Sequence, residues 1–120
     1  MRVLVCGGRD FTNYLLLHKE LLLLYHCNKI TEVIHGGARG ADKMGGKWFT
    51  DRHIPERVFK ADWELHGKAA GPIRNQQMLD EGKPDLVIAF RGGNGTRDMI
   101  MRAKKAGIRV IEVNESLLKM

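Results

Sequence analysis

Short apolar runs alternate with amphipathic segments along this chain. The apolar runs predict five β-strands, at residues 2–6, 30–35, 56–60, 85–90 and 108–113. Apolar residues at helical spacing predict helices over about 14–27, around 41–48, over 72–81 and between 96 and 106, with a polar loop at 62–71. Strands that alternate with helices favour right-handed crossovers and a parallel sheet covered on both faces. We therefore predict an α/β, Rossmann-like three-layer sandwich whose five-stranded sheet has the order 3-2-1-4-5, formed by residues 1–120 as one domain.

Residue types at the ends of these segments indicate where the helices begin and end. Thr12 or Asn13 is expected to cap the first helix and Thr96 the last, whereas Pro72 suits a first helical position and Gly107 a position just past a helix end. The face predicted to be buried in the first helix comprises Leu15, Leu16, Leu22 and Leu23. In the last helix it comprises Met99, Ile100, Ala103 and Ala106.

Composition narrows the class of protein. Twenty Lys and Arg residues against 14 Asp and Glu give a net charge of +6, which favours an anionic partner. Two cysteines are too few for a disulfide framework and favour a reducing, cytoplasmic setting. We expect no signal peptide and no membrane association. The five histidines lack zinc-site spacing, so we expect no metal site, and we predict no cofactor.

Glycine is the unusual residue in this composition, because eight of the 14 glycines cluster in three turns. The turns follow three predicted strands, at residues 7–9, 36–40 and 91–96. In a parallel sheet these turns meet at one edge, where the crevice of a doubly wound fold binds its ligand. Glycine lets backbone approach a ligand closely, and the second and third turns open helices whose free N–H groups favour an anion. The sequence therefore predicts a phosphate site, although it matches neither GxGxxG nor the P-loop motif.

Two of these turns resemble known motifs. HGGARGAD, residues 35–42, is similar to a segment of DNA-processing protein A, and RGGNGTRDM, residues 91–99, resembles the PGGxGTxxE segment of the LOG phosphoribohydrolases. With the CGGRDF start and the stretch at 61–78, nearly the whole chain resembles the small YspA-type branch of the SLOG superfamily, which occurs in bacteria and phages. The resemblance implies a Rossmann-like fold that binds nucleotides or nucleotide-derived ligands, in a host's cytoplasm if a phage encodes the chain. It also implies a homodimer or larger homo-oligomer.

The resemblance also implies roles for individual residues. The third turn would hold a phosphate, the second would line the neighbouring wall, and Arg74 with Met78 matches the RxxxM spacing whose Arg takes part in LOG catalysis. The catalytic Glu of the LOG motif is replaced here by Met99, with Asp98 beside it, and Arg91 replaces the leading Pro. Glycosidic cleavage needs a carboxylate, so whether the ligand is turned over stays open.

The residues themselves add further candidates. Arg9 suits a phosphate, and Asp42 could contact a ribose, act as a base or cap the second helix. Arg74 and Asn75 are expected in a first helical turn, where a cation such as Arg74 is unfavourable for the helix dipole, which favours a ligand contact. Trp63 in the polar loop could stack on a base or fill a subunit interface. The predicted ligand-binding set is Gly7, Gly8, Arg9, Gly36, Gly37, Arg39, Asp42, Arg74, Asn75, Arg91, Gly92, Gly93, Gly95 and Thr96, and the catalytic candidates are Arg74, Asp98 and Asp42.

Three functions fit this pattern. The first is binding of a nucleotide or nucleotide-derived small anion, in a sensing or sequestering role. The second is N-glycosidic hydrolysis of LOG type. The third is binding of single-stranded nucleic acid, favoured by the positive charge but opposed by an aromatic content of only 7%, which gives no stacking array.

Overall fold

The computed structural model describes residues 1–114 and contains the predicted parallel sheet. Its strands are β1 (Arg2–Cys6), β2 (Glu32–His35), β3 (Glu56–Val58), β4 (Leu86–Ala89) and β5 (Arg109–Glu112). All four pairings are parallel and the order is β3-β2-β1-β4-β5, so the predicted topology is confirmed. The order reverses direction next to β1, which places the switch point of this fold between β1 and β4.

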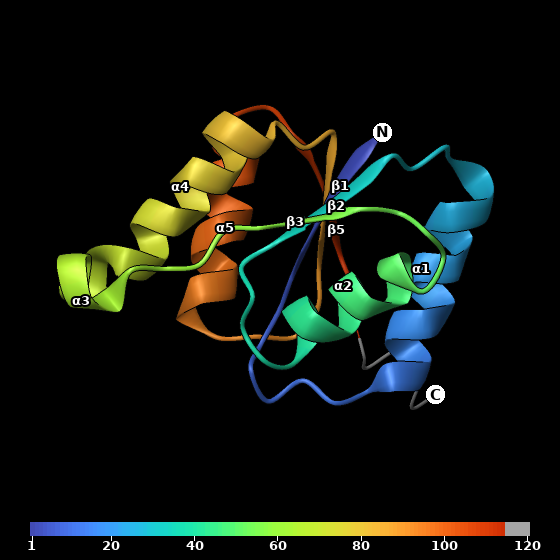
Figure 1. Ribbon diagram of the computed structural model, residues 1–120, viewed down its shortest axis with the longest axis horizontal. Helices are drawn as coiled ribbons and strands as arrows, with labels where there is room; N and C mark the ends of the chain where they lie inside the picture. Colours follow the sequence, from blue (N-terminus) through green and yellow to red (C-terminus); the bar gives the residue numbers. More distant parts are fainter. Residues whose placement is uncertain (115–120) are drawn as a thin grey trace.

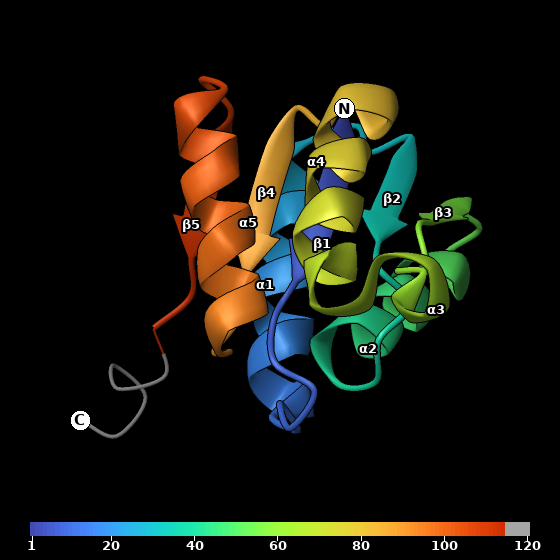
Figure 2. The same cartoon turned by 90° about the vertical axis from the view of Figure 1, so that its left-hand side faces the viewer.

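Helices cover both faces of the sheet, as Figures 1 and 2 show. The helices are α1 (Tyr14–Cys27), α2 (Ala41–Thr50), α3 (Trp63–His66), α4 (Ala70–Gly82) and α5 (Asn94–Lys105), with a 3-10 turn at Gly67–Ala69 between α3 and α4. Alternate residues of β1 point to opposite faces: Val3 and Val5 pack beneath α1 and α2, and Leu4 and Cys6 beneath α4 and α5. The predicted three-layer α/β sandwich is therefore confirmed.

Two predicted helix faces differ from the structure. In α1, Leu15 and Leu23 are 80% and 57% exposed, and the buried residues are Leu16, Leu17 and Leu21. Apolar residues nearly surround this helix, so its sequence does not mark one face and packing on the sheet decides. In α5, Met99 and Ala103 are buried as predicted, whereas Ala106 is exposed at the helix end.

The helix starts also need correction. Asn13 caps α1 as predicted, its Oδ1 accepting from Leu16 N at 3.1 Å. Gly93, however, occupies the cap position of α5, and Thr96 lies inside its first turn. The predicted polar loop contains α3, which Asp62 caps by accepting from Leu65 N at 3.0 Å. The 3-10 turn after α3 runs directly into α4, which begins at Ala70. Pro72 is therefore the third residue of α4 rather than its first.

The second crossover helix packs very closely on the sheet. A Cβ at Gly45 of α2 would lie 2.7 Å from Val5 Cγ1, so only glycine permits this approach. Trp48 of the same helix is 1% exposed and belongs to the core cluster on this face of the sheet. Gly107 follows α5 with a φ of +77°, as its predicted position after a helix end requires. Within residues 1–114, no helix combines the length and apolar character that crossing a bilayer requires.

Candidate functional site

The three glycine turns lie together at the carboxyl edge of the sheet. The first turn, at residues 7–9, touches both of the others: Gly8 N donates to Arg91 O at 2.8 Å, and Gly8 O accepts from Ala41 N at 3.3 Å. A Cβ on Gly8 would lie 2.9 Å from Arg91 O, so glycine is needed for the contact between turns. The backbone itself therefore brings these turns to the switch point of the sheet.

A cavity of about 300 Å³ opens between the first and third turns and helix α4. Nine of the predicted ligand-binding residues line it: Gly7, Gly8, Arg9, Asp42, Arg74, Asn75, Gly93, Gly95 and Thr96. Five further residues complete the lining: Cys6, Ala38, Trp63, Gly71 and Met78. Five predicted residues lie outside the lining, namely Gly36, Gly37, Arg39, Arg91 and Gly92.

One face of α4 forms a wall of this cavity. Gly71, Arg74, Asn75 and Met78 follow each other at i, i+3, i+4 and i+7, so their side chains lie on the same side of the helix. Because α4 begins at Ala70, Arg74 and Asn75 occupy its second turn rather than its first, and the predicted conflict with the helix dipole does not arise. Gly71 is absent from the residues predicted to bind the ligand. Its position three residues before Arg74 on the same helix could have indicated that it lines the cavity.

The second turn is closed around Gly36. Asp42 Oδ2 accepts from Gly36 N at 3.0 Å and from Ala38 N at 3.4 Å, while Arg74 Nη1 donates to Gly36 O at 3.0 Å. A Cβ on Gly36 would overlap the Arg74 guanidinium. His35 Nδ1 also accepts from Gly37 N at 3.0 Å, and its Nε2 lies 2.7 Å from Glu56 Oε2. Side chains of the protein therefore already use the backbone groups of this turn.

Backbone groups of the protein also bond or crowd the start of α2. Gly40 caps the helix with a φ of +84°, and a Cβ there would overlap the backbone oxygen of Gly8. Ala41 N donates to Gly8 O, and Lys43 N donates to Ala38 O at 3.2 Å. Asp42 therefore does not cap α2. It lies in the first turn and bonds the preceding loop.

The third turn is open at Gly93 and Gly95 by contrast, although a Cβ on its first glycine, Gly92, would overlap Thr96 Oγ1 and crowd Gly8 N. No atom lies within 4 Å of where a Cβ would stand on Gly93 or Gly95, and both residues line the cavity. Gly93 caps α5, and the first hydrogen bond of that helix runs from Arg97 N to Gly93 O at 3.1 Å. Within residues 1–114, no protein acceptor bonds the N–H groups of Asn94, Gly95 and Thr96. An anion in the cavity would meet these donors at the positive end of the helix.

Burial shifts the pKa values of three residues that line the cavity. The pKa of Asp42 is raised by burial of its carboxyl group, against the opposing attraction of His35 and Arg74. Burial also lowers the pKa of Arg74, and Asp42 opposes that shift. The pKa of the Cys6 thiol is raised strongly by burial, so Cys6 stays a neutral thiol near pH 7 and is unsuited to nucleophilic attack.

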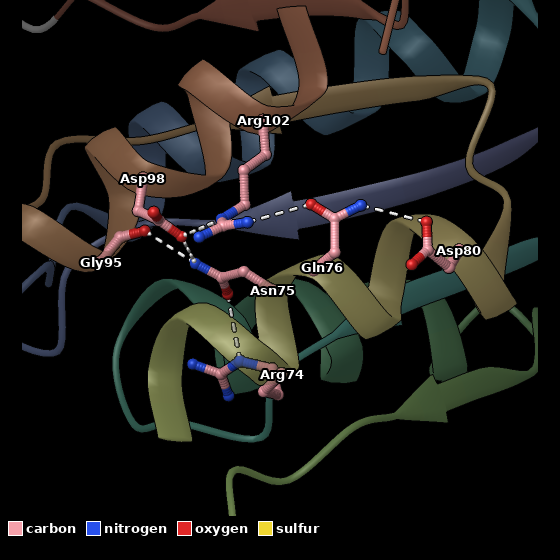
Figure 3. Close-up of polar contacts among 7 residues, drawn as sticks. All are labelled: Arg74, Asn75, Gln76, Asp80, Gly95, Asp98 and Arg102. Atoms are coloured by element: carbon pink, nitrogen blue, oxygen red, sulfur yellow. Dashed lines mark hydrogen bonds and ion pairs between the residues drawn. The ribbon is translucent and has the colours of Figure 1, made fainter. Parts of the chain in front are cut away.

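A polar network joins α4 to α5 beside the cavity (Figure 3). Asn75 Nδ2 donates to Gly95 O at 3.1 Å and to Asp98 Oδ2 at 3.0 Å, and Arg102 Nε donates to the same Asp98 oxygen at 2.8 Å. The network continues through Gln76 to Asp80. Asp98 thus bonds its neighbouring helix and does not line the cavity, unlike the catalytic candidates Arg74 and Asp42.

The residue at the position of the LOG glutamate faces the core. Met99 is 1% exposed and packs in the cluster beneath α4 and α5, together with Met78, which reaches the cavity. Asp42 is the single carboxylate among the lining residues within the described part of the chain. The hydrogen bonds that it accepts from Gly36 N and Ala38 N both end on Oδ2.

Two predicted arginines lie at the rim. Arg39 Nη2 is 3.8 Å from Asp10 Oδ1, and both side chains are largely exposed. Arg91 is exposed, while its backbone oxygen accepts the bond from Gly8. Across residues 1–114, no group of three or more histidine, cysteine or acidic side chains is arranged to hold a metal ion.

Three comparisons relate this chain to known proteins. The family model described as "YspA, cpYpsA-related SLOG family" matches residues 1–66. The Gene 61 protein of Mycobacterium phage D29 is 36% identical over 122 residues, covering 95% of this chain and 97% of the relative. The crystal structure of a UDP-N-acetylglucosamine 2-epimerase matches 94% of this chain with a TM-score of 0.58 at 17% identity. This chain spans 33% of that epimerase, so the likeness concerns the fold alone.

Proposed function

The chain belongs to the YspA, cpYpsA-related SLOG family, and from this premise we propose that its cavity binds a nucleotide or a nucleotide-derived ligand through the phosphate. The observation that carries the proposal is the open start of α5. Three consecutive N–H groups, at residues 94–96, have no acceptor within residues 1–114 and adjoin a cavity lined by Gly93 and Gly95. A tetrahedral oxyanion is the ligand that such a helix start favours.

Charge and size support the same ligand. Arg9 and Arg74 both line the cavity, and a guanidinium can bind phosphate oxygens in pairs. A cavity of about 300 Å³ is at the small end of the range for small-molecule sites, which suits one mononucleotide better than a polymer. The ligand is therefore a small anion with one phosphate at the glycine turns.

Calorimetric titration of the purified chain with the four nucleoside 5′-monophosphates and the matching nucleosides tests this proposal. At least one monophosphate should bind, and its nucleoside should bind at least tenfold more weakly because it offers no anion to α5. Arg9→Ala should weaken monophosphate binding by about tenfold, the effect of one charge-assisted contact. Equal affinity for nucleoside and nucleotide would refute the phosphate site.

The same titration separates a small ligand from a nucleic acid. Binding of single-stranded DNA in place of mononucleotides, with an affinity that falls steeply and log-linearly with salt, would favour the polymer. We expect a shallow salt dependence, since a mononucleotide brings one phosphate to the protein.

Asp42 favours a second candidate function, N-glycosidic hydrolysis. Its carboxylate lines the cavity beside Arg74, and glycosidic cleavage uses a carboxylate to activate water or to stabilise the cationic sugar. In this reaction water would add to the anomeric carbon as the bond from that carbon to the base nitrogen breaks. The proton of the water would pass to Asp42 and from there, through solvent, to the departing base, which regenerates the carboxylate. The products are the free base and a sugar phosphate.

Chromatography of nucleoside monophosphates incubated with the chain tests this second function. Release of free base that Asp42→Asn and Arg74→Ala both abolish would support hydrolysis. Release that persists in Asp42→Asn would exclude Asp42 as the base. Intact nucleotide after prolonged incubation would leave binding, in a sensing or sequestering role, as the function.

We also propose that residues 1–120 act as one domain, as a homodimer or larger homo-oligomer in the cytoplasm. The family relationship to a phage protein supports a host cytoplasm as the setting. Sedimentation velocity of the purified chain tests the oligomer.

A further inference from the structure

Trp63 has an unusual environment for such a large apolar side chain. It is 49% exposed, yet it lines the cavity that also holds the glycine turns. It belongs to α3, a helix of four residues that buries none of its side chains. Figure 1 shows α3 at the far end of α4, away from the sheet. Core packing therefore does not account for a tryptophan at this position.

The surroundings of Trp63 hold its ring at the cavity. Asp62 caps α3 through Leu65 N, and the 3-10 turn after α3 joins the end of this helix directly to α4, which forms the cavity wall. A Cβ on Gly71 would lie 3.4 Å from Trp63 Cη2, so the ring rests over this glycine. Gly71 belongs to the α4 face that carries Arg74 and Met78 into the same cavity.

The lining of the cavity differs from one part to another. Trp63, Gly71 and Met78 contribute apolar surface from α3 and α4. Gly93, Gly95 and Thr96 contribute backbone donors from the start of α5. A ligand that satisfies both parts carries an anionic group and a flat apolar group.

We infer that Trp63 is a stacking platform for the planar heteroaromatic ring of the ligand. This inference rests on the proposed nucleotide site and deepens it, because it names the residue that binds the base. Nucleotides fall in this class, whereas sugar phosphates and inorganic phosphate do not. Stacking on a tryptophan tolerates any base, so the platform provides affinity for the ring without selecting its identity.

Paired titrations with AMP and ribose 5-phosphate test the platform, because the two probes share the phosphate and the sugar and differ in the base. Trp63→Ala should weaken AMP binding by about 5- to 150-fold, the range for one base stacked on an aromatic ring. The affinity for ribose 5-phosphate should change by less than about twofold. Trp63→Phe keeps a ring and should restore most of the AMP affinity. Leu65→Ala is the matched control, since Leu65 is 72% exposed on the same helix and does not line the cavity.

Fluorescence gives a second readout that does not depend on affinity. The chain has two tryptophans, and Trp48 is buried at 1% exposure. Saturating AMP should therefore quench the emission of the wild-type chain but not that of Trp63→Phe. Ribose 5-phosphate should quench neither.

Each other outcome overturns the inference in a distinguishable way. Unchanged AMP affinity in Trp63→Ala, or an equal loss for both probes, would refute the platform and leave the phosphate site standing. Dissociation of a wild-type oligomer in Trp63→Ala, with AMP affinity unchanged, would assign Trp63 to a subunit interface. Failure of the wild-type chain to bind either probe would refute the phosphate site and the platform together.

Discussion

The second and third glycine turns share a sequence pattern but differ in what surrounds them. At the second turn, Asp42 and Arg74 bond the backbone of Gly36 from both sides, and the first turn bonds the start of α2. At the third turn, Gly93 and Gly95 face open space and the start of α5 bonds no protein acceptor within residues 1–114. Glycines after a strand therefore indicate either close packing of backbone or open space. The second turn is closely packed, whereas the third turn is packed at Gly92 and open at Gly93 and Gly95.

This difference gives the two turns different tasks. The closed second turn fixes the position of Asp42 and Arg74, which line the cavity, while the open third turn supplies free donors. Substitutions in the second turn should mainly change the free energy of unfolding. Substitutions in the third turn should mainly change ligand affinity.

The largest effect is expected for Gly40→Ala in the closed turn. The added Cβ would overlap the backbone of Gly8 at a φ of +84°, and neither backbone segment can move freely. Strain and overpacking together should lower the free energy of unfolding by about 2–5 kcal/mol, measured by urea denaturation. A loss below about 0.5 kcal/mol would show that the turn is not closed.

Asp98→Ala should have the next largest effect, on stability alone. It leaves Arg102 and the buried Asn75 without their shared acceptor, which should cost about 1–3 kcal/mol of unfolding free energy. Because Asp98 does not line the cavity, nucleotide affinity should stay within about twofold of wild type. Loss of affinity without loss of stability would instead place Asp98 in contact with the ligand, as the catalytic role suggested by the sequence would require.

Asp42 should make the closed turn sensitive to pH. Its pKa is raised in the folded chain by burial, above its usual 3.8, so the folded state favours the protonated carboxyl. The stability of wild type relative to Asp42→Asn should therefore rise as pH falls through the folded pKa toward the unfolded value of 3.8. The rise should be about 1.4 kcal/mol for each pH unit that separates the folded pKa from the unfolded one. Urea denaturation of both chains at several pH values measures this, and a difference that does not change with pH would contradict the raised pKa.

The smallest effect is expected for Arg39→Ala at the rim. The pair of Arg39 and Asp10 is 3.8 Å apart and largely exposed, and such pairs contribute little to stability. Unfolding free energy should change by less than about 0.5 kcal/mol, and nucleotide affinity should fall less than in Arg9→Ala. Arg9 lines the cavity, and Arg39 does not. An equal loss of affinity in both variants would extend the site onto the second turn.

The fold could be predicted from the sequence further than the site could. The apolar run at residues 86–89 and the glycine clusters mark strands and their ends. The alternation of strands with helices predicts the parallel sheet, and the predicted strand order is confirmed. That the three glycine turns meet at one edge of the sheet could also be predicted from the sequence. It could not show that the backbone of Gly36 is already bonded, since Arg74 Nη1 reaches Gly36 O from a residue 38 positions away. For the same reason it held no sign that Asp98 bonds Asn75 on the neighbouring helix.

Gly95→Ala separates phosphate binding from folding, because it adds a single methyl group at the open start of α5. No atom lies within 4 Å of where its Cβ would stand, and Gly95 is in the first turn of α5, so the variant should be as stable as wild type or up to about 1 kcal/mol more stable. The same Cβ would enter the proposed phosphate site. Calorimetric titration with AMP should then show at least a tenfold loss of affinity in a chain that is fully folded, with Asp98→Ala as the control outside the cavity. Unchanged AMP affinity in Gly95→Ala would show that the start of α5 does not bind the phosphate.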